Sequence, residues 1–303
     1  MLTGLIAAPF TAMRSDGGVD FSSIDRYVRF LIRNDISGAY ICGTTGEGLL
    51  LSVSERLMLA EKWVHASQGN LPIIVHVGHT SISESRTLAA HAKRIGADAI
   101  TTMGPIFIKP DSLEKVVDFC GEVADAAPGL PFYYYHVPVQ TGLPYSAFDF
   151  ARLAAQRIPT FAGLKFTHED LMDFRQCVLF ENGRLNVLFG RDEMLLAALV
   201  FGAHGAVGST YNFAAPLYHK IIEAHKAADM RTALTHQTQA IELVAIYKKY
   251  GLISAGKAIM KIIACDVGPV RSPLTNLSQD QYVELRRDLE RIGFFDYCCK
   301  LPC

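Results

Sequence analysis

A single lysine lies within the otherwise apolar segment FAGLKFT, residues 161–167. Burial of an ammonium group in apolar surroundings is costly, so a lysine in such a segment is unusual. If the segment is a strand, Lys165 shares one face with Phe161, Gly163 and Thr167. Desolvation there would lower the pKa of the amine and leave more of it neutral for attack on a carbonyl. A lysine that is ion-paired or that reaches solvent is the structural alternative.

The segment PFYYYHVP, residues 131–138, offers phenols to the same chemistry. Because side chains alternate along a strand, Tyr133 and Tyr135 are expected on one face, and Tyr134 and His136 on the other. A phenol at the end of a strand can transfer protons. Aromatic residues also favour strands for packing reasons alone, so each tyrosine has a structural interpretation as well.

The Gly-rich loop GTTGEG, residues 43–48, follows a short apolar segment. Its glycines permit a tight turn and close approach of the backbone, while Thr44 and Thr45 offer hydroxyls and N–H groups. Such a loop suits a carboxylate or a phosphate. An ordinary turn is the alternative, and the glycine spacing differs from the dinucleotide-binding fingerprint.

Two later segments end in polar residues that suit a hydroxylated ligand. LFGRDE contains Gly190, Asp192 and Glu193, and GAVGSTYN contains Ser209. The two carboxylates are candidate acceptors for substrate hydroxyls. They are equally interpretable as the acidic residues that favour the start of a helix.

The histidines and cysteines give little support for a metal. His76 and His79 have an odd separation, which places them on opposite faces of a strand, so a zinc-dependent site is not favoured. The terminal residues Cys298, Cys299 and Cys303 are interpreted as part of a mobile terminus. We therefore expect no metal.

Eight short apolar segments alternate with amphipathic stretches along the chain. The expected strands are residues 2–10, 39–42, 72–77, 99–103, 131–137, 161–166, 186–189 and 206–209. Capping boxes are expected at Ser52 with Glu55 and at Ser81 with Glu84, and a weaker version at Asp111 with Glu114. This alternation predicts an α/β fold, a (β/α)8 TIM barrel over residues 1–213. Residues 214–303 are expected to form a C-terminal helical extension, packed on the barrel as one structural unit. An open doubly wound sheet is the competing fold.

The composition excludes several classes of protein. The chain has 303 residues, 50% hydrophobic and 19% charged, with a net charge of −1, which argues against disorder and against nucleic acid or an anionic membrane as partner. The longest clean apolar run, residues 194–201, is too short to span a bilayer. The apolar N-terminus is interpreted as a first strand. Four cysteines in apolar segments indicate reduced thiols in a cytoplasmic protein, namely Cys42, Cys120, Cys177 and Cys265.

These motifs, in this order, resemble the N-acetylneuraminate lyase branch of the pyruvate-dependent class I aldolases. The matching segments are GTTGEG, YYYHVP, GLKFT, LFGRDE and GAVGSTYN, each at the end of a different expected strand. The same superfamily includes dihydrodipicolinate synthase. The resemblance runs from about residue 3 to about residue 275, and GTTGEGLLLSVSER and PFYYYHVP look most like the animal form.

The resemblance implies a barrel that assembles as a homotetramer and a lyase of sialic acid degradation. Lys165 matches the lysine that forms a Schiff base with the substrate, and Tyr135 matches the proton-transferring tyrosine. Thr44 and Thr45 match the residues that hold the pyruvate carboxylate. The positions that bind the hydroxylated sugar tail match Gly190, Asp192, Glu193 and Ser209, and Thr167 matches a hydroxyl near the C4 oxygen of the substrate. The implied substrates are sialic acid, or pyruvate and N-acetylmannosamine, with no cofactor beyond the covalent lysine.

Two positions separate the chain from the synthase branch. Phe107 stands where that branch has a tyrosine that reaches a neighbouring subunit's site, and it lacks the hydroxyl. Gln140 stands where that branch has an arginine, and it lacks the charge. Both differences argue against dihydrodipicolinate synthesis. Gln140 also differs from the aliphatic residue typical of the lyases, which leaves the preferred sialic acid open.

Three other functions remain as alternatives. The nearest is another pyruvate-dependent aldolase, such as one acting on 2-keto-3-deoxy sugar acids. A non-catalytic binder of a sugar or carboxylate would have no need of Lys165 and Tyr135. A nucleotide-dependent enzyme would use the Gly-rich loop, and its nucleotide would raise the melting temperature.

Overall fold

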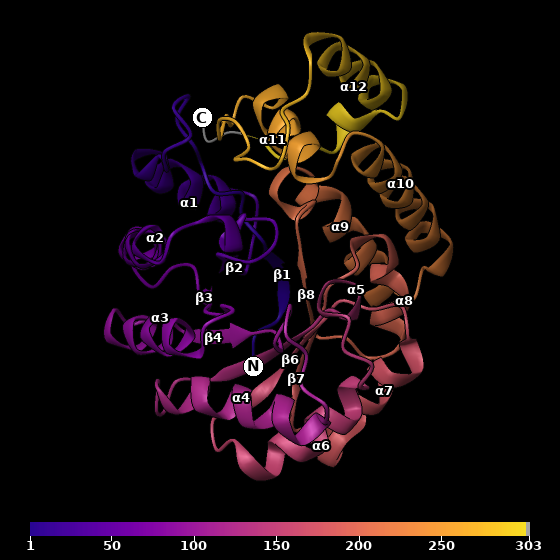
Figure 1. Ribbon diagram of the computed structural model, residues 1–303. Helices are drawn as coiled ribbons and strands as arrows, with labels where there is room; N and C mark the ends of the chain where they lie inside the picture. Colours follow the sequence, from indigo (N-terminus) through magenta and orange to yellow (C-terminus); the bar gives the residue numbers. More distant parts are fainter. Residues whose placement is uncertain (301–303) are drawn as a thin grey trace.

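The computed structural model describes residues 1–300. Within this range eight parallel strands close into a barrel in chain order, so that the last strand pairs with the first. The competing open sheet is therefore excluded. Figure 1 shows the strands at the centre of the molecule with helices around them. The strands are β1 Gly4–Ala7, β2 Gly38–Ile41, β3 Ile73–His76, β4 Ala99–Thr102, β5 Phe132–His136, β6 Phe161–Phe166, β7 Asn186–Phe189 and β8 Gly205–Gly208.

All eight expected strands are confirmed, and two of them have the predicted bounds. One expectation about β6 is wrong: Phe161 does not share the face of Lys165. The register shifts between Phe132 and Tyr133 of β5, because Phe132 pairs with Phe161 whereas Tyr133 pairs with Gly163. This bulge resets the alternation of side chains. Phe161 consequently packs outside the barrel, where its ring meets the ring of Phe150.

Helices follow the strands and form a ring around the barrel (Figure 1). The ring consists of α1 Ile24–Arg33, α2 Val53–Ser67, α3 Ile82–Arg94, α4 Leu113–Asp125, α6 Ala147–Arg157, α7 Leu171–Leu179, α8 Leu195–Val200 and α9 Tyr211–Lys226. A single turn, α5 Pro138–Thr141, directly follows β5. The expected alternation of strand and helix is confirmed.

The predicted helix starts are confirmed in part. Ser52 and Glu55 form the complete capping box of α2. The box expected at α3 is only half formed, because the Ser81 backbone N–H donates to Nδ1 of His79 at 3.0 Å rather than to a glutamate. At α4 the cap is Ser112 rather than Asp111, and its hydroxyl accepts from the Lys115 N–H.

The remaining helices, which we call the C-terminal helices, pack against one side of the ring. They are α10 Met230–Lys249, α11 Ile253–Ile262 and α12 Gln279–Arg291. In Figure 1 they form the orange and yellow part of the molecule, beside α9. The expected boundary between residues 213 and 214 falls inside α9, where Ala214 departs from helical geometry.

The end of the described chain is packed, so the expectation of a mobile terminus is wrong for Cys298 and Cys299. Cys299 exposes only 2% of its surface, and its sulfur accepts from the Ala215 N–H at 3.2 Å. Cys298 is half-buried. The reason is that the chain returns from α12 to the kink in α9 and fills the space there. Cys303 lies outside the described residues.

Two groups of apolar side chains make up the core. The larger lies between the strands and the helices, and the smaller fills the barrel itself, where Ile6, Tyr40, Tyr133, Tyr135 and Leu188 meet. The four cysteines expected to be buried free thiols are confirmed as such. Within residues 1–300, no helix has both the length and the apolar character that crossing a membrane requires.

Candidate active site

One cavity at the carboxyl ends of the strands brings together all nine candidate residues. It has a volume of about 350 Å³. Its lining includes Lys165, Tyr135, Thr44, Thr45, Thr167, Gly190, Asp192, Glu193 and Ser209. Loops after five strands, β2, β5, β6, β7 and β8, therefore converge on one place, as expected for a barrel enzyme.

Lys165 lies inside the barrel and is only 6% exposed. Its Nζ lies 4.0 Å from the centroid of the Tyr40 ring and 4.3 Å from that of the Tyr135 ring. Burial lowers the pKa of Lys165, while the Tyr135 phenol and the Asp192 carboxylate oppose that shift. A lysine in this setting has more neutral amine at pH 7 than a lysine in water, which is what a carbonyl nucleophile requires.

The three tyrosines of β5 divide between the two faces as predicted. Tyr133 and Tyr135 belong to the core inside the barrel. Tyr134 stacks on Phe150 outside it, with 3.7 Å between ring centroids. Tyr135 is paired with Lys165 across the two strands. Tyr133 lies deeper, where its hydroxyl donates to Asn186 Oδ1 at 2.9 Å, so Tyr135 is the phenol that lines the cavity beside the lysine.

The Gly-rich loop places Thr44 and Thr45 at the mouth of the cavity. The loop is closed by two backbone hydrogen bonds, from Gly48 N to Gly43 O and from Glu47 N to Thr44 O, both 3.0 Å long. A Cβ on Gly48 would lie 1.7 Å from the Cys42 carbonyl oxygen, so only glycine fits there. The tight turn leaves the two threonines facing the space above Lys165, where they suit a carboxylate.

Asp192 is a buried carboxylate in the wall of the cavity. Its Oδ2 accepts from the Thr210 backbone N–H at 3.0 Å and from the Thr210 hydroxyl at 2.6 Å. Gly208 makes room for it, because a Cβ there would lie 2.0 Å from Asp192 Oδ1. Burial raises the pKa of Asp192 to about 6, and the hydrogen bonds from Thr210 oppose the shift.

The C-terminal helices also contribute to the cavity, which the sequence did not reveal. Val244, Tyr247 and Lys248 of α10 line it together with Glu193. Lys248 Nζ donates to Glu193 Oε1 at 2.7 Å, so the glutamate at the rim is held by an ion pair. No local pattern in the sequence pairs α10 with the loop after β7, because their contact depends on how the helices pack.

A smaller cavity of about 240 Å³ adjoins the first, and Thr44 and Gln140 line both. The His76 imidazole forms part of its wall, and neither ring nitrogen has a hydrogen-bond partner among the described residues. Burial, with the positive charges of Arg56 and Lys165, lowers the pKa of His76 well below its usual value. Its imidazole is therefore neutral at pH 7. The spacing of His76 and His79 had suggested no role for His76 other than that of a metal ligand.

Among residues 1–300, no three His, Cys, Asp or Glu side chains lie close enough together to hold a metal ion. His79, the other histidine considered for a metal, lies in the turn before α3, where its Nδ1 accepts from the Ser81 N–H. The groups that converge on the cavity are instead an amine, a phenol, hydroxyls and carboxylates. This set suits covalent chemistry at a carbonyl, with recognition of a carboxylate and several hydroxyls.

Comparison with known proteins identifies close relatives along the whole chain. The model of the dihydrodipicolinate synthetase family matches residues 1–292. The N-acetylneuraminate lyase of Sus scrofa is 44% identical over 284 residues, which cover 92% of this chain and 89% of that protein. The N-acetylneuraminate lyase of Homo sapiens is 42% identical over 301 residues, which cover 98% of this chain and 94% of that protein.

Solved structures agree with this likeness. The structure of the Proteus mirabilis N-acetylneuraminate lyase matches with a TM-score of 0.94 at 39% identity, covering 97% of this chain and 99% of that chain. The native structure of the sialic acid aldolase from Aliivibrio salmonicida matches with a TM-score of 0.94 at 41% identity, covering 97% of each chain.

Proposed function

Since this chain belongs to the dihydrodipicolinate synthetase family, we propose that it is a lyase that cleaves N-acetylneuraminate to N-acetylmannosamine and pyruvate, reversibly. The observation that carries the proposal is the position of Lys165: a buried lysine, beside the Tyr135 ring, in a cavity lined with hydroxyls and carboxylates. The relatives named N-acetylneuraminate lyase, at 42% to 44% identity, support the choice of substrate.

The reaction begins when the neutral Lys165 amine attacks the C2 ketone of the open-chain sialic acid. Loss of water gives an iminium ion at C2, which withdraws electrons from the C3–C4 bond. The hydroxyls and N–H groups of Thr44 and Thr45 hold the adjacent carboxylate. The lowered pKa of Lys165 supports this step, because only the unprotonated amine is a nucleophile.

Cleavage follows when the C4 hydroxyl loses its proton. The C3–C4 electron pair moves to the iminium, which leaves an enamine of pyruvate on Lys165 and releases N-acetylmannosamine. The Tyr135 phenol relays the proton, together with the substrate carboxylate. Protonation of the enamine at C3 and hydrolysis of the new iminium release pyruvate and restore the free lysine.

The polar wall of the cavity recognises the hydroxylated tail of the substrate. Asp192 and Glu193 accept hydrogen bonds from its hydroxyls, with Gly190 and Ser209 beside them. The Thr167 hydroxyl lines the cavity and has no partner among residues 1–300, so it is available to the C4 oxygen, the role that the family resemblance implies for it. A tail of several hydroxyls matches this wall better than a short deoxy chain does.

Because the lysine itself acts as the electron sink, we propose that the reaction needs no metal and no organic cofactor. We also propose a cytoplasmic location, which the free thiols support, since such thiols are typical of reducing compartments. A homotetramer is the proposed assembly. Phe107 and Ile108 are 86% and 78% exposed, and apolar side chains of this size are suited to a contact between subunits. Native mass spectrometry tests the assembly.

A substrate panel tests the proposed activity. N-acetylneuraminate and a 2-keto-3-deoxy sugar acid are each supplied, and the release of pyruvate is measured for both. We expect kcat/KM to be higher for N-acetylneuraminate by about tenfold or more, because only its tail fills the polar wall. Equal or faster cleavage of the deoxy acid would identify the alternative aldolase instead.

A further inference from the structure

Glu47, a residue of the Gly-rich loop, forms an ion pair with Lys257 that is almost completely buried. Glu47 Oε1 lies 2.7 Å from Lys257 Nζ, and their side chains are 0% and 3% exposed. Lys257 belongs to α11, and its Nζ also donates to the Pro269 carbonyl at 2.6 Å. Neither residue lines the cavity that contains Lys165, although Glu47 lines the smaller cavity beside it, so no step of the proposed reaction uses the pair directly.

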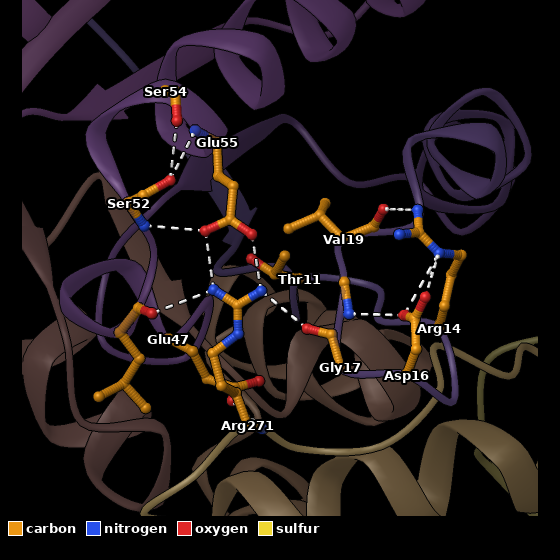
Figure 2. Close-up of polar contacts among 12 residues, drawn as sticks. Thr11, Arg14, Asp16, Gly17, Val19, Glu47, Ser52, Ser54, Glu55 and Arg271 are labelled. Carbon is orange, nitrogen blue, oxygen red and sulfur yellow. Dashed lines mark hydrogen bonds and ion pairs between the residues drawn. The ribbon is translucent and has the colours of Figure 1, made fainter.

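The second carboxylate oxygen of Glu47 is also held by the C-terminal part of the chain. The Arg271 backbone N–H donates to Glu47 Oε2 at 2.8 Å. The Arg271 guanidinium faces the Glu55 carboxylate and donates to both of its oxygens at 2.7 and 2.8 Å, as Figure 2 shows. The same guanidinium donates to the carbonyls of Leu50 and Gly17 at 3.1 and 2.8 Å. Arg271 therefore links the chain on both sides of the loop.

The conformation of the loop depends on these contacts. Glu47 has a φ of 56°, in the left-handed region that side chains other than glycine seldom adopt. Its backbone N–H closes the turn on the Thr44 carbonyl, and the Thr11 hydroxyl donates to the Gly46 carbonyl at 2.6 Å. A strained residue persists only where its surroundings hold it. Here Lys257 and the Arg271 N–H hold the buried Glu47 carboxylate, and this fixes the backbone of the residue.

Buried ion pairs contribute little net stability, because desolvation of the two charges offsets their attraction. Glu47 and Lys257 could be replaced by apolar residues if only stability mattered. The ion pair connects α11 with the turn that carries Thr44 and Thr45. Arg271 connects the loop before α12 with the same turn. The arrangement fixes the position of a short segment rather than filling space.

We propose that Glu47 is a positioning residue that holds Thr44 and Thr45 in the geometry that binds the carboxylate of the 2-keto acid. Lys257 and Arg271 supply the fixed partners, so α11 and the segment between α11 and α12 set the affinity for pyruvate. This inference rests on the proposed function, since it takes the carboxylate of pyruvate as the group that the loop binds.

The test measures how much pyruvate is needed to form the borohydride-reduced adduct on Lys165. The variants are Glu47→Gln, Lys257→Met and the double variant, which restores charge neutrality. Each single variant is expected to raise the half-saturating pyruvate concentration by about tenfold, which corresponds to about 1.4 kcal/mol. At saturating pyruvate, kcat for condensation with N-acetylmannosamine is expected to stay within about twofold, because Lys165 and Tyr135 are untouched.

The double variant separates positioning from stability. Replacing both charges removes the penalty of an unpaired buried ion, so its melting temperature is expected to recover towards that of the wild type. The half-saturating pyruvate concentration is expected to stay raised, because the neutral pair no longer fixes the turn. Recovery of both quantities together would show that the pair is only structural.

Asp288→Asn is the matched control, since it removes another ion pair among the C-terminal helices, that with Lys249 at 2.8 Å. It is expected to lower the melting temperature without changing the pyruvate requirement. If the variants at Glu47 and Lys257 do not fold, Arg271→Lys can replace them, because it weakens the half-buried ion pair with Glu55. It is also expected to raise the half-saturating pyruvate concentration. An unchanged pyruvate requirement in folded variants would refute the inference alone. A wild-type protein that forms no adduct would refute the proposed function as well.

Discussion

From the raised pKa of Asp192 we predict how its replacement by asparagine changes the free energy of unfolding at different pH values. In the folded protein burial raises the pKa of Asp192 from 3.8 to about 6. The fold therefore favours the protonated carboxyl, and stability is lost as the pH rises from about 4 through 6. A shift of about two pKa units, at about 1.4 kcal/mol per unit, gives a cost of about 3 kcal/mol that is complete above about pH 7. Asp192→Asn removes that cost, because an amide does not ionise.

The asparagine keeps the local hydrogen bonds. Both bonds from Thr210 go to Asp192 Oδ2, and the amide oxygen can take that place. We therefore expect Asp192→Asn to be more stable than the wild type at pH 8, by up to about 3 kcal/mol, with the gap closing as the pH falls towards 4. Its kcat/KM for N-acetylneuraminate is expected to fall by about tenfold or more, because the tail loses a charged acceptor.

Denaturant unfolding at pH 8, 6 and 4.5 measures this prediction, with both proteins at the same concentration so that any assembly contributes equally. Asp229→Asn is the control, since this exposed carboxylate caps α10 by accepting from the Thr232 backbone N–H and does not line the cavity. A variant that is less stable than the wild type at pH 8, or a difference that does not change with pH, would refute the reasoning about burial.

The other predictions concern the phenol, the rim and the cofactor. Tyr135→Phe is expected to lower kcat by about a hundredfold, because proton transfer is lost. The pyruvate adduct on Lys165 is still expected to form, because the nucleophile is kept. Steady-state kinetics measures the first effect, and mass spectrometry measures the second. Lys248→Met removes the 2.7 Å ion pair to Glu193 and is expected to raise KM for N-acetylneuraminate by about two- to fivefold, since exposed pairs contribute at most about 1 kcal/mol. An unchanged KM would show that Glu193 needs no such support. Dialysis against EDTA is expected to leave turnover unchanged, and a loss restored by added divalent metal would contradict the lysine mechanism.

The barrel and the unusual position of Lys165 could be predicted because the evidence for them is local, whereas the role of Tyr135 came from the resemblance to the class I aldolases. Strand alternation puts Tyr135 on the opposite face from Tyr134, and the apolar residues around Lys165 indicate that the lysine is buried. The two meet because β5 and β6 are neighbours in chain order, which any parallel barrel guarantees. The error at Phe161 arises because strict alternation holds only until a bulge adds a residue. Gly163, which lies beside the extra residue, is of a type often found at bulges, but it was interpreted only as part of the face of Lys165.

The contacts made by the C-terminal helices could not be predicted in this way. Glu47 and Arg271 are 224 positions apart, and Glu193 and Lys248 are 55 apart. Their pairing depends on where α10 and α11 dock on the barrel, which helical periodicity does not specify. Cys299 was misjudged for the same reason, because its packing against Ala215 depends on the return of the chain from α12. A terminal segment of mixed residues carries no local sign of that contact.

The central claim is that Lys165 forms a Schiff base with the 2-keto acid. Incubation with pyruvate and borohydride, followed by intact mass measurement and peptide mapping, tests it most directly. One reduced pyruvyl adduct per chain is expected, on the peptide that contains Lys165. A folded protein that acquires no adduct, or one that carries it on another lysine, would contradict the claim.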